Sequence, residues 1–417
     1  MGLIFKKKES KDAQKKTVTE LVIYLDTKNE AIHLYTMTDG AKESLTCSVT
    51  DYRARAFERE FFDKIGEILE GYRESHPDVP LQKVSVVLPD SVIITDTINV
   101  PTIGKRAMSK SINVVLSNIF RNSAELTFNQ NQAAQNSQFS TFNVVGTHKK
   151  IIARLHRALA EHQVGIANIT YASSAAASAV SALNPKMRGA SYVILDVKND
   201  FCRGVFVAKG KAIGFFTLPF GENILKNDRV IPEESLFNHS AAELIVLNAK
   251  ENAKSKAMSL ADKPLEEYAE EGADAAPAER KKKLRAAVRK VPASLIRPLP
   301  ENEEGFVYEN FRIILKWALG TISSNVPTTA LGFPEAIYLN LPEKHSFLYE
   351  KLAEESEECG ITIAPLFTEA ESEDIKNNIE IFGGFYYKQY NKANNLPCGP
   401  FAEFAKYENE DSAQGES

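Results

Sequence analysis

The sequence lacks the features that mark several common classes of protein. Nowhere does it approach about 18 consecutive apolar residues, the length that crosses a bilayer. Its four cysteines lie far apart and form no CxxC pair, which argues against a disulfide framework or a structural zinc site. A net charge of -5 gives no global reason to expect nucleic acid as a partner. These absences predict a globular protein of a reducing compartment, and we expect it in the cytoplasm.

Motifs of the common enzyme classes are missing too. The seven histidines form no HExxH or other metal-spaced cluster, so we expect no metal site. Ser173 and Ser174 lie among small residues without a GxSxG elbow, and helix packing explains them. No Walker loop and no GxGxxG follows a predicted strand. The sequence therefore offers no catalytic residues of a known arrangement.

The N-terminal stretch MGLIFKKKESKDAQKK has three apolar residues before its lysines, far fewer than the core of a signal peptide. We expect 1–18 to be a basic, flexible terminus. Clustered lysines can also contact an anionic membrane surface, so a peripheral place on the inner face of the cell membrane stays open.

What the sequence does contain is a pair of similar units. The stretch 192–221 reads as three short strands joined by two tight turns, with Asp196 at the end of the first, buried strand. The stretch 21–37 is a shorter version, with Asp26 in the corresponding place. Two such units in a chain of 417 residues, which is too long for one compact core, predict an internally duplicated α/β protein.

Other elements follow from the spacing of apolar residues. Helices are predicted over 53–73, 105–120, 149–162, 171–183, 241–258, 306–323, 347–358 and 374–390. Strands are predicted over 45–49, 84–88, 92–100, 142–146, 166–171, 336–341 and 361–366. The polar run 129–140 is predicted to be a loop or a poorly ordered strand connection. The small residues of 171–183 favour tight packing or a pivot between lobes, and Gly383-Gly384 favours a close helix contact.

The order of these elements resembles the actin-like ATPase superfamily, and within it the type IV pilus assembly proteins called PilM and their cell-division relative FtsA. Three stretches carry the resemblance. The segment 84–101 (VSVVLPDSVIITDTINVP) resembles the passage into the extra small subdomain of the family. The segment 192–221 resembles the second phosphate hairpin and its sequel, and 335–366 resembles the late strand–helix–strand.

The resemblance implies a duplicated, ribonuclease H-like fold with two lobes. It implies a first subdomain from 19–92 and 166–188, interrupted by a small subdomain over 93–165. The second subdomain would comprise 189–235 and 326–395, interrupted by a helical subdomain over 236–325 with a charged linker at 259–290. The acidic tail 396–417 is predicted to be disordered.

The three loops that would hold nucleotide depart from the family. They lack the glycines that let backbone N–H groups approach phosphate. We interpret them as a vestigial nucleotide site, composed of Asp26, Thr27, Lys28, Asn29, Asp196, Lys198, Asn199, Asp200 and Asn340. No cofactor is expected. The alternative is ATP with Mg²⁺ held by Asp26 and Asp196, in an active ATPase of the same type.

The resemblance also implies a partner. A protein of this family would be a cytoplasmic scaffold of a pilus or secretion machine, binding the N-terminal cytoplasmic segment of a single-span inner-membrane protein; a homo-oligomer stays open. The peptide would lie in a groove between the first and the small subdomain. Candidate groove residues are Ile93, Thr95, Ile98, Met108, Ile112 and Val115, for which ordinary subdomain core is the competing interpretation.

Overall fold

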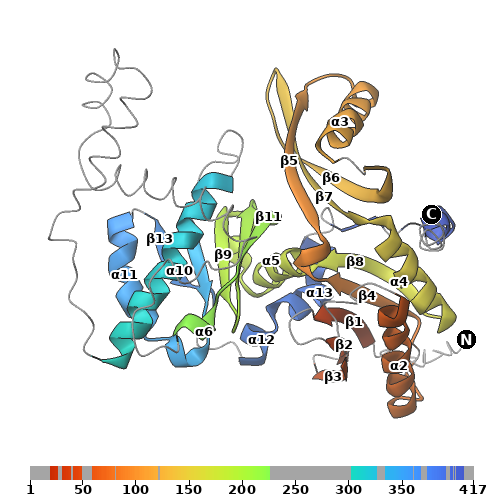
Figure 1. Ribbon diagram of the computed structural model, residues 1–417, viewed down its shortest axis with the longest axis horizontal. Coiled ribbons are helices and arrows are strands. Elements are labelled where there is room, and N and C mark those ends of the chain that lie inside the picture. Colours follow the sequence, from red (N-terminus) through yellow and green to blue (C-terminus); the bar gives the residue numbers. More distant parts are fainter. Residues whose placement is uncertain are drawn as a thin grey trace, which may run out of the picture.

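The computed structural model describes residues 19–26, 31–38, 41–48, 59–79, 81–120, 123–225, 302–325, 334–359, 361–367, 373–390, 395–397, 399 and 401–407. These residues form two lobes, each built on a five-stranded sheet, and a smaller three-stranded subdomain (Figure 1). Among the described residues, no helix is long and apolar enough to cross a membrane.

The first lobe contains a mixed sheet in the order β3-β2-β1-β4-β8. Its strands are β1 (Thr19–Asp26), β2 (Ala31–Thr38), β3 (Ala41–Ser48), β4 (Lys83–Leu88) and β8 (Gly165–Tyr171). The first three are antiparallel neighbours, whereas β4 and β8 run parallel to β1. Helices α2 (Arg59–Ser75) and α4 (Lys149–Glu161) bury their apolar residues in the core on one side of this sheet.

The second lobe repeats this topology. Its sheet has the order β11-β10-β9-β12-β13, again with three antiparallel strands followed by two parallel ones. The strands are β9 (Tyr192–Val197), β10 (Cys202–Ala208), β11 (Lys211–Leu218), β12 (Ala336–Asn340) and β13 (Thr362–Pro365). Its helices are α6 (Glu222–Leu225), α10 (Glu303–Asn325) and α11 (Leu348–Cys359). The predicted internal duplication, and with it the actin-like fold class, is confirmed.

Two helices lie between the sheets and belong to both lobes. Helix α5 (Ala172–Leu183) follows the first sheet but packs on β10 and β11 of the second. Helix α13 (Ile379–Tyr390) follows the second sheet, after the short α12 (Glu373–Asn377), and packs on β1 and β4 of the first. The two lobes are therefore joined by exchanged helices (Figure 1).

Glycine permits the close contact of these helices. A Cβ at Gly383 would lie 1.6 Å from the carbonyl oxygen of Ala175, and one at Gly384 would meet the side chains of Val22 and Val87. The separations of these two Cβ positions from the Ala175 oxygen and from the valine side chains are shorter than any real Cβ contact. Larger residues at Gly383 or Gly384 would therefore push α13 away from α5 and β1. The prediction of a close helix contact at this pair is confirmed.

The small subdomain is inserted between β4 and α4. It consists of the sheet β5-β7-β6 and of helix α3 (Lys105–Ile119), which packs on it. The strands are β5 (Ile94–Pro101), β6 (Leu126–Gln135) and β7 (Phe139–His148). The 3-10 turn Asp90–Val92 precedes β5, so this strand begins later than the sequence predicts.

Several predictions of the sequence differ from the structure. Most of the polar run 129–140 is strand, not loop, because β6 pairs through its backbone along β7 and needs no apolar side chains on its exposed side. Helix α4, predicted within the small subdomain, packs instead in the core of the first lobe through Ile152, Leu155 and Leu159. Helix α10, predicted within the helical insertion, packs in the core of the second lobe.

The C-terminal stretch also differs. The sequence predicts disorder over 396–417, but Leu396 and Phe404 are buried in the core of the first lobe. The structure places a short helix, α14 (Phe401–Phe404), and a 3-10 turn, Ala405–Tyr407, in this stretch. Two buried apolar residues thus anchor the described part of this stretch to the first lobe. The predicted helix over 241–258 and the linker 259–290 lie outside the described residues.

Candidate functional site between the two lobes

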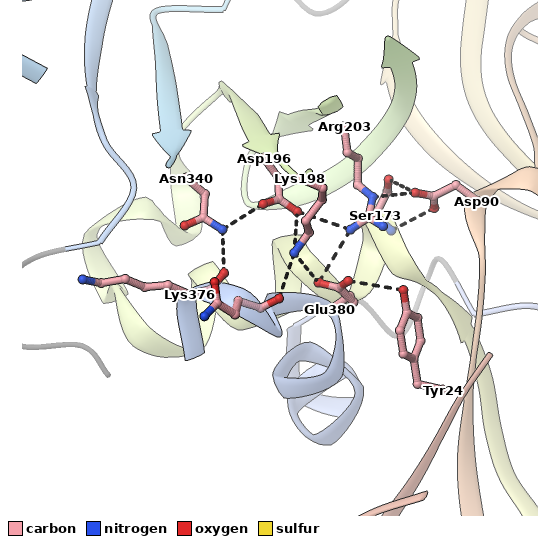
Figure 2. A network of polar contacts seen from close by, with 10 residues as sticks. Tyr24, Asp90, Ser173, Asp196, Lys198, Arg203, Asn340, Lys376 and Glu380 are labelled. Atoms are coloured by element: carbon pink, nitrogen blue, oxygen red, sulfur yellow. Dashed lines mark hydrogen bonds and ion pairs between the residues drawn. The ribbon is translucent and has the colours of Figure 1, made fainter. Parts of the chain in front are cut away.

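The ends of two parallel strands bring the first polar residues of the site together. Asp196 lies near the end of β9 and pairs in register with Asn340, the last residue of β12. The side-chain amide of Asn340 donates hydrogen bonds of 2.8 Å to the Asp196 carboxylate and 2.7 Å to the carbonyl oxygen of Lys376 (Figure 2). Asp196 is only 1% exposed, so its charge is withdrawn from water. Such a carboxylate requires nearby cations or donors.

Lys198 supplies one of these cations. Its ammonium group lies 3.2 Å from Asp196 Oδ2 and 3.4 Å from Glu380 Oε2, between strand β9 and helix α13 (Figure 2). It also donates a hydrogen bond of 2.9 Å to the carbonyl oxygen of Asn377. Three acceptors therefore surround one ammonium group, which matches its three donors.

Arg203 supplies the second cation. Its guanidinium lies 2.9 Å from Asp90 Oδ2, 3.5 Å from Asp196 Oδ2 and 3.7 Å from Glu380 Oε2. Because Arg203 is on β10 and Asp90 follows β4, the pair links the second lobe to the first. Arg203 is thus the centre of a network that crosses the interface between the lobes (Figure 2).

Asp90 is held in addition by the N-terminus of α5. Its two carboxylate oxygens accept hydrogen bonds from the backbone N–H of Ser173, at 2.9 Å, and from the hydroxyl of Ser173, at 2.8 Å. A carboxylate is favoured there by the unpaired N–H groups and the dipole of the helix. The contact orients Asp90 toward Arg203.

A second link between the lobes runs through Tyr24 of β1. Its hydroxyl donates a hydrogen bond of 3.3 Å to Glu380, which belongs to the helix exchanged from the second lobe. Burial, and then the nearby Glu380 carboxylate, raise the pKa of Tyr24 well above its usual value, so it remains a donor.

The buried charges alter one another's protonation. Burial alone would raise the pKa of Glu380, but Lys198 and Arg203 outweigh it and lower that pKa. Burial tends to lower the pKa of Lys198, yet Asp196 and Glu380 raise it. For Asp90, burial prevails and raises the pKa in spite of Arg203 and Ser173. These contacts thus keep Lys198 charged and Glu380 ionised. We call the set the interlobe network; its members are Tyr24, Asp90, Ser173, Asp196, Lys198, Arg203, Asn340 and Glu380.

The structure places the predicted nucleotide residues at several separate points. Asp196, Lys198 and Asn340 come together in the interlobe network. Asn199 and Asp200 form the turn after β9, where the Asn199 amide donates to the Asp200 carboxylate at 2.6 Å. Asp26 is buried at the end of β1 with its carboxylate 3.4 Å from His33 Nε2 on the neighbouring strand. Thr27, Lys28 and Asn29 lie outside the described residues.

The predicted groove residues divide between two cores. Ile93 packs in the core of the first lobe, while Ile98 and Ile112 are buried in the core of the small subdomain. Met108 and Val115 pack against that core from its edge. Thr95 is half-buried on β5.

Sequence reasoning missed most of the network: Tyr24, Asp90, Ser173, Arg203 and Glu380. A signal was present for two of them. Arg203 stands in the otherwise apolar strand CRGVFVA, and Glu380 in the apolar helix start IEIFGG. A charge within an apolar element is costly unless it is paired, so each predicted a buried partner. Which residues form the pairs depends on the exchange of the two helices, which the sequence does not reveal.

The described residues contain no group of three or more His, Cys, Asp or Glu side chains arranged to hold a metal ion. The carboxylates of the interlobe network face lysine and arginine instead. Its chemistry is that of a set of buried ion pairs.

Comparison with known proteins yields similarity in structure alone. No protein-family model matches the chain, and no curated protein matches it in sequence. One similar solved structure is the PilM-PilN type IV pilus biogenesis complex, with 13% identity, a TM-score of 0.49 and coverage of 89% of this chain and 98% of that one. Another is the cytoplasmic domain of EpsL, an inner-membrane component of the type II secretion system of Vibrio cholerae. There the identity is 13%, the TM-score 0.34, and the coverage 51% and 76%.

A third is a protein of unknown function from Bacteroides thetaiotaomicron with an actin-like ATPase fold. It has 11% identity, a TM-score of 0.31 and coverage of 54% of this chain and 77% of that one. Identities this low say nothing about activity or partners.

Proposed function

We propose that this protein, which has the duplicated actin-like fold, acts as a scaffold and not as an ATPase. Its work would be to bind a membrane partner within a type IV pilus or related secretion machine, at the inner face of the cell membrane. The machine is taken from the resemblance of the sequence to the PilM type, and the loss of ATPase activity from the site.

One observation carries the proposal: the carboxylates between the lobes are paired with Lys198 and Arg203 of the chain itself. A Mg²⁺–nucleotide group at this place would need Asp196 with free oxygens. Here Asp196 Oδ2 faces Lys198 at 3.2 Å and Arg203 at 3.5 Å, and its Oδ1 accepts from Asn340 at 2.8 Å. Nucleotide would have to displace buried ion pairs, and a buried charge left without its partner is strongly destabilising. The residues present do not fit the group.

The surface of the small subdomain supports the scaffold role. In the described part of the chain, the large apolar side chains that are exposed all belong to it: Ile103, Val114, Ile119 and Phe139. Val114, on α3, is 59% exposed. Apolar side chains that gather on one subdomain are typical of a surface that binds another protein. We propose that the cytoplasmic N-terminal segment of a single-span inner-membrane protein binds beside them.

Calorimetry with MgATP tests the proposed loss of nucleotide binding. The full chain, shown to be folded by its thermal transition, is titrated to millimolar nucleotide, and no heat of binding is expected. Micromolar binding that is lost in Asp26→Ala or Asp196→Ala would establish the alternative, a live ATPase. The placement of both aspartates at corresponding strand ends of the two lobes is what favours that alternative.

Site-specific photo-crosslinking tests the proposed docking of a membrane partner on the small subdomain. A photo-reactive residue at Val114 is compared in cells with one at Glu67, a comparably exposed position on α2 with a side chain 57% exposed. Crosslinks from Val114 to the N-terminal segment of a single-span membrane protein, absent from Glu67, are expected. Crosslinks of equal yield from both positions would remove the small subdomain as the docking surface.

A further inference from the structure

The small subdomain differs in charge from the rest of the chain. The whole chain has a net charge of -5, yet no acidic residue stands between Asp96 and Glu125. The same stretch contains four basic residues: Lys105, Arg106, Lys110 and Arg121. The hairpin that follows, 126–147, has no Asp, Glu, Lys or Arg at all. A cationic element within an acidic chain indicates an anionic partner.

Two connections form the end of this subdomain that points away from the lobes (Figure 1). One of them, 102–104, joins β5 to α3, and the other, 136–138, joins β6 to β7. The backbone N–H of Thr102 donates a hydrogen bond of 2.9 Å to the carbonyl oxygen of Gln138, and its hydroxyl donates one of 3.0 Å to that of Asn136. The two connections therefore make one surface. We call it the subdomain tip and define it as residues 102–106 and 136–139.

The turn between β6 and β7 is fixed by hydrogen bonds of its own. The side-chain oxygen of Asn136 accepts from the backbone N–H of Gln138 at 2.9 Å and from that of Phe139 at 2.6 Å. The N–H of Asn136 donates in turn to the carbonyl oxygen of Phe139 at 2.9 Å. A surface that is ordered before binding loses little conformational entropy when it binds.

Two large apolar side chains are exposed at the tip. Ile103 is 41% exposed and Phe139 is 47% exposed. They belong to the two connections that Thr102 joins, and Phe139 pairs in register with Pro101 of β5. An apolar residue exposed alone is common, but two on one ordered surface indicate a contact with an apolar environment.

Basic side chains border the apolar ones. Arg106 and Lys110 are exposed on α3, and Val114 is exposed one turn further on. Residues four apart share a helix face, so the two cations lead from the tip along one side of α3. The first turn of α3 has no acidic residue and no side-chain cap, so the positive end of the helix adds to their field.

We propose that the subdomain tip binds an anionic lipid surface. Ile103 and Phe139 enter the boundary between headgroups and acyl chains, while Arg106 and Lys110 contact the phosphates of the headgroups through their long stems. The proposal rests on the scaffold function proposed above and adds the surface by which the protein lies on the membrane. A membrane partner's cytoplasmic segment leaves the same bilayer, so this contact brings the small subdomain close to that segment.

The charge pattern distinguishes lipid from a second copy of the chain. Two copies related by a twofold axis would bring the same cations together, and like charges oppose such a contact. An anionic bilayer instead supplies phosphates for the cations and an apolar layer directly beneath them for the isoleucine and the phenylalanine. Each cation near the surface contributes about fivefold to the affinity, so two of them give weak and reversible binding.

Co-sedimentation with vesicles tests the proposal. The probe is vesicles of phosphatidylcholine with about one third phosphatidylglycerol, and vesicles of phosphatidylcholine alone are the neutral comparison. The full chain is expected to bind the anionic vesicles only, and added salt should weaken this binding. Ile103→Thr/Phe139→Thr should bind at least about 10-fold more weakly, because threonine suits exposed backbone but adds little apolar area. Arg106→Gln/Lys110→Gln should lose about 10-fold or more.

Matched controls change similar residues elsewhere. Ile119→Thr removes a side chain that is 45% exposed at the other end of α3. Lys83→Gln/Lys211→Gln removes two exposed charges from β4 and β11 of the lobes. Both controls should bind as the wild type does. No binding of the wild type, tip variants that bind normally, or controls that lose as much would overturn the proposal. A loss confined to Lys6→Gln/Lys7→Gln/Lys8→Gln would also overturn it, because the contact would then belong to the N-terminal stretch.

Hydrogen exchange of the wild type detects the contact without any substitution. Anionic vesicles should slow the exchange of the hydrogen-bonded amides of Thr102 and Phe139 at least about 10-fold and leave that of Phe120, beyond the other end of α3, unchanged. No slowing at the tip would show the proposal to be wrong. Equal slowing by inorganic phosphate without vesicles would do so as well, because the tip would then bind an anion and not a lipid surface.

The outcomes separate this inference from the scaffold function. Crosslinks from Val114 to a membrane protein, together with a tip that ignores anionic vesicles, would refute this inference and leave the scaffold function standing. A tip that binds the vesicles, without any crosslinked membrane protein, would do the reverse.

Discussion

Replacing Arg203 with methionine is the sharpest test of the interlobe network. The side chain is 5% exposed, and its guanidinium is 2.9 Å from the Asp90 carboxylate. Methionine keeps the apolar stem of arginine but removes the charge. Asp90 then loses its cation, whereas Asp196 and Glu380 keep Lys198. Asp90 keeps its two hydrogen bonds from Ser173.

The loss of stability depends on whether Asp90 stays ionised or binds a proton once Arg203 is removed. Removing one partner of a buried pair costs about 3–5 kcal/mol when the other stays charged. Asp90 avoids part of this cost by binding a proton. From its ordinary pKa of 3.8, protonation costs at most about 4 kcal/mol at pH 7 and about 1.6 kcal/mol at pH 5. The destabilisation by Arg203→Met is therefore expected to be larger at pH 7 than at pH 5, with about 4 kcal/mol as its upper limit at pH 7.

Urea unfolding at pH 7 and at pH 5 measures the destabilisation by Arg203→Met. Fluorescence of Trp317, the single tryptophan, reports on the second lobe, and circular dichroism reports on both lobes. Lys64→Met is the control, because Lys64 forms an exposed pair with Glu67 on α2 and its loss is worth at most about 1 kcal/mol. In the double variant Asp90→Asn/Arg203→Met, the loss is expected to be smaller than the sum of the single losses by about 2 kcal/mol. A loss below about 1 kcal/mol for Arg203→Met at pH 7, or one that grows at pH 5, would refute the reasoning.

Three further predictions concern other contacts. Gly383→Ala forces a methyl group against the backbone of Ala175, and we expect a loss of about 1–3 kcal/mol in urea unfolding, whereas Gly71→Ala on α2, with nothing within 4 Å, should be neutral or stabilising. Asn340→Ala removes hydrogen bonds of 2.8 and 2.7 Å at a buried position and should cost about 1–3 kcal/mol by the same assay; an unchanged midpoint would contradict it. Burial lowers the pKa of His156 from its ordinary value of 6.5, so the neutral ring is favoured while it packs on Phe404, and this contact should weaken as the pH falls below 6.5. The rate of exchange of the Leu396 amide, corrected for intrinsic pH dependence, measures this, and His156→Gln should abolish the trend.

The sequence determines the duplicated architecture because local patterns repeat. Buried strands that end in Asp26 and Asp196, each followed by a hairpin, predict two similar units, and the structure contains two sheets of the same strand order. The helices α3 and α10 follow their apolar spacing closely, whereas the single helix predicted over 374–390 is divided into α12 and α13. The polar strand β6 could not be predicted, because backbone pairing with β7 forms it and leaves no trace in side-chain polarity.

The candidate site shows the same division between local and tertiary information. Asp196, Lys198 and Asn340 could be identified because each stands at or near the end of an apolar strand, a position that sequence reveals. Asp90, Arg203 and Glu380 come from three separate stretches, and each alone reads as an isolated charge.

The sequence by itself therefore determined the two lobes, their strand-end acids and the small-residue helix between them. Tertiary structure alone decided that α5 and α13 are exchanged between the lobes and that the interlobe carboxylates face the protein's own cations. It also decided that Leu396 pairs with β8, the edge strand of the first sheet. The physical reason is that burial of a charge or of a sheet edge depends on partners distant in the chain, whereas helical and strand periodicity depends only on near neighbours.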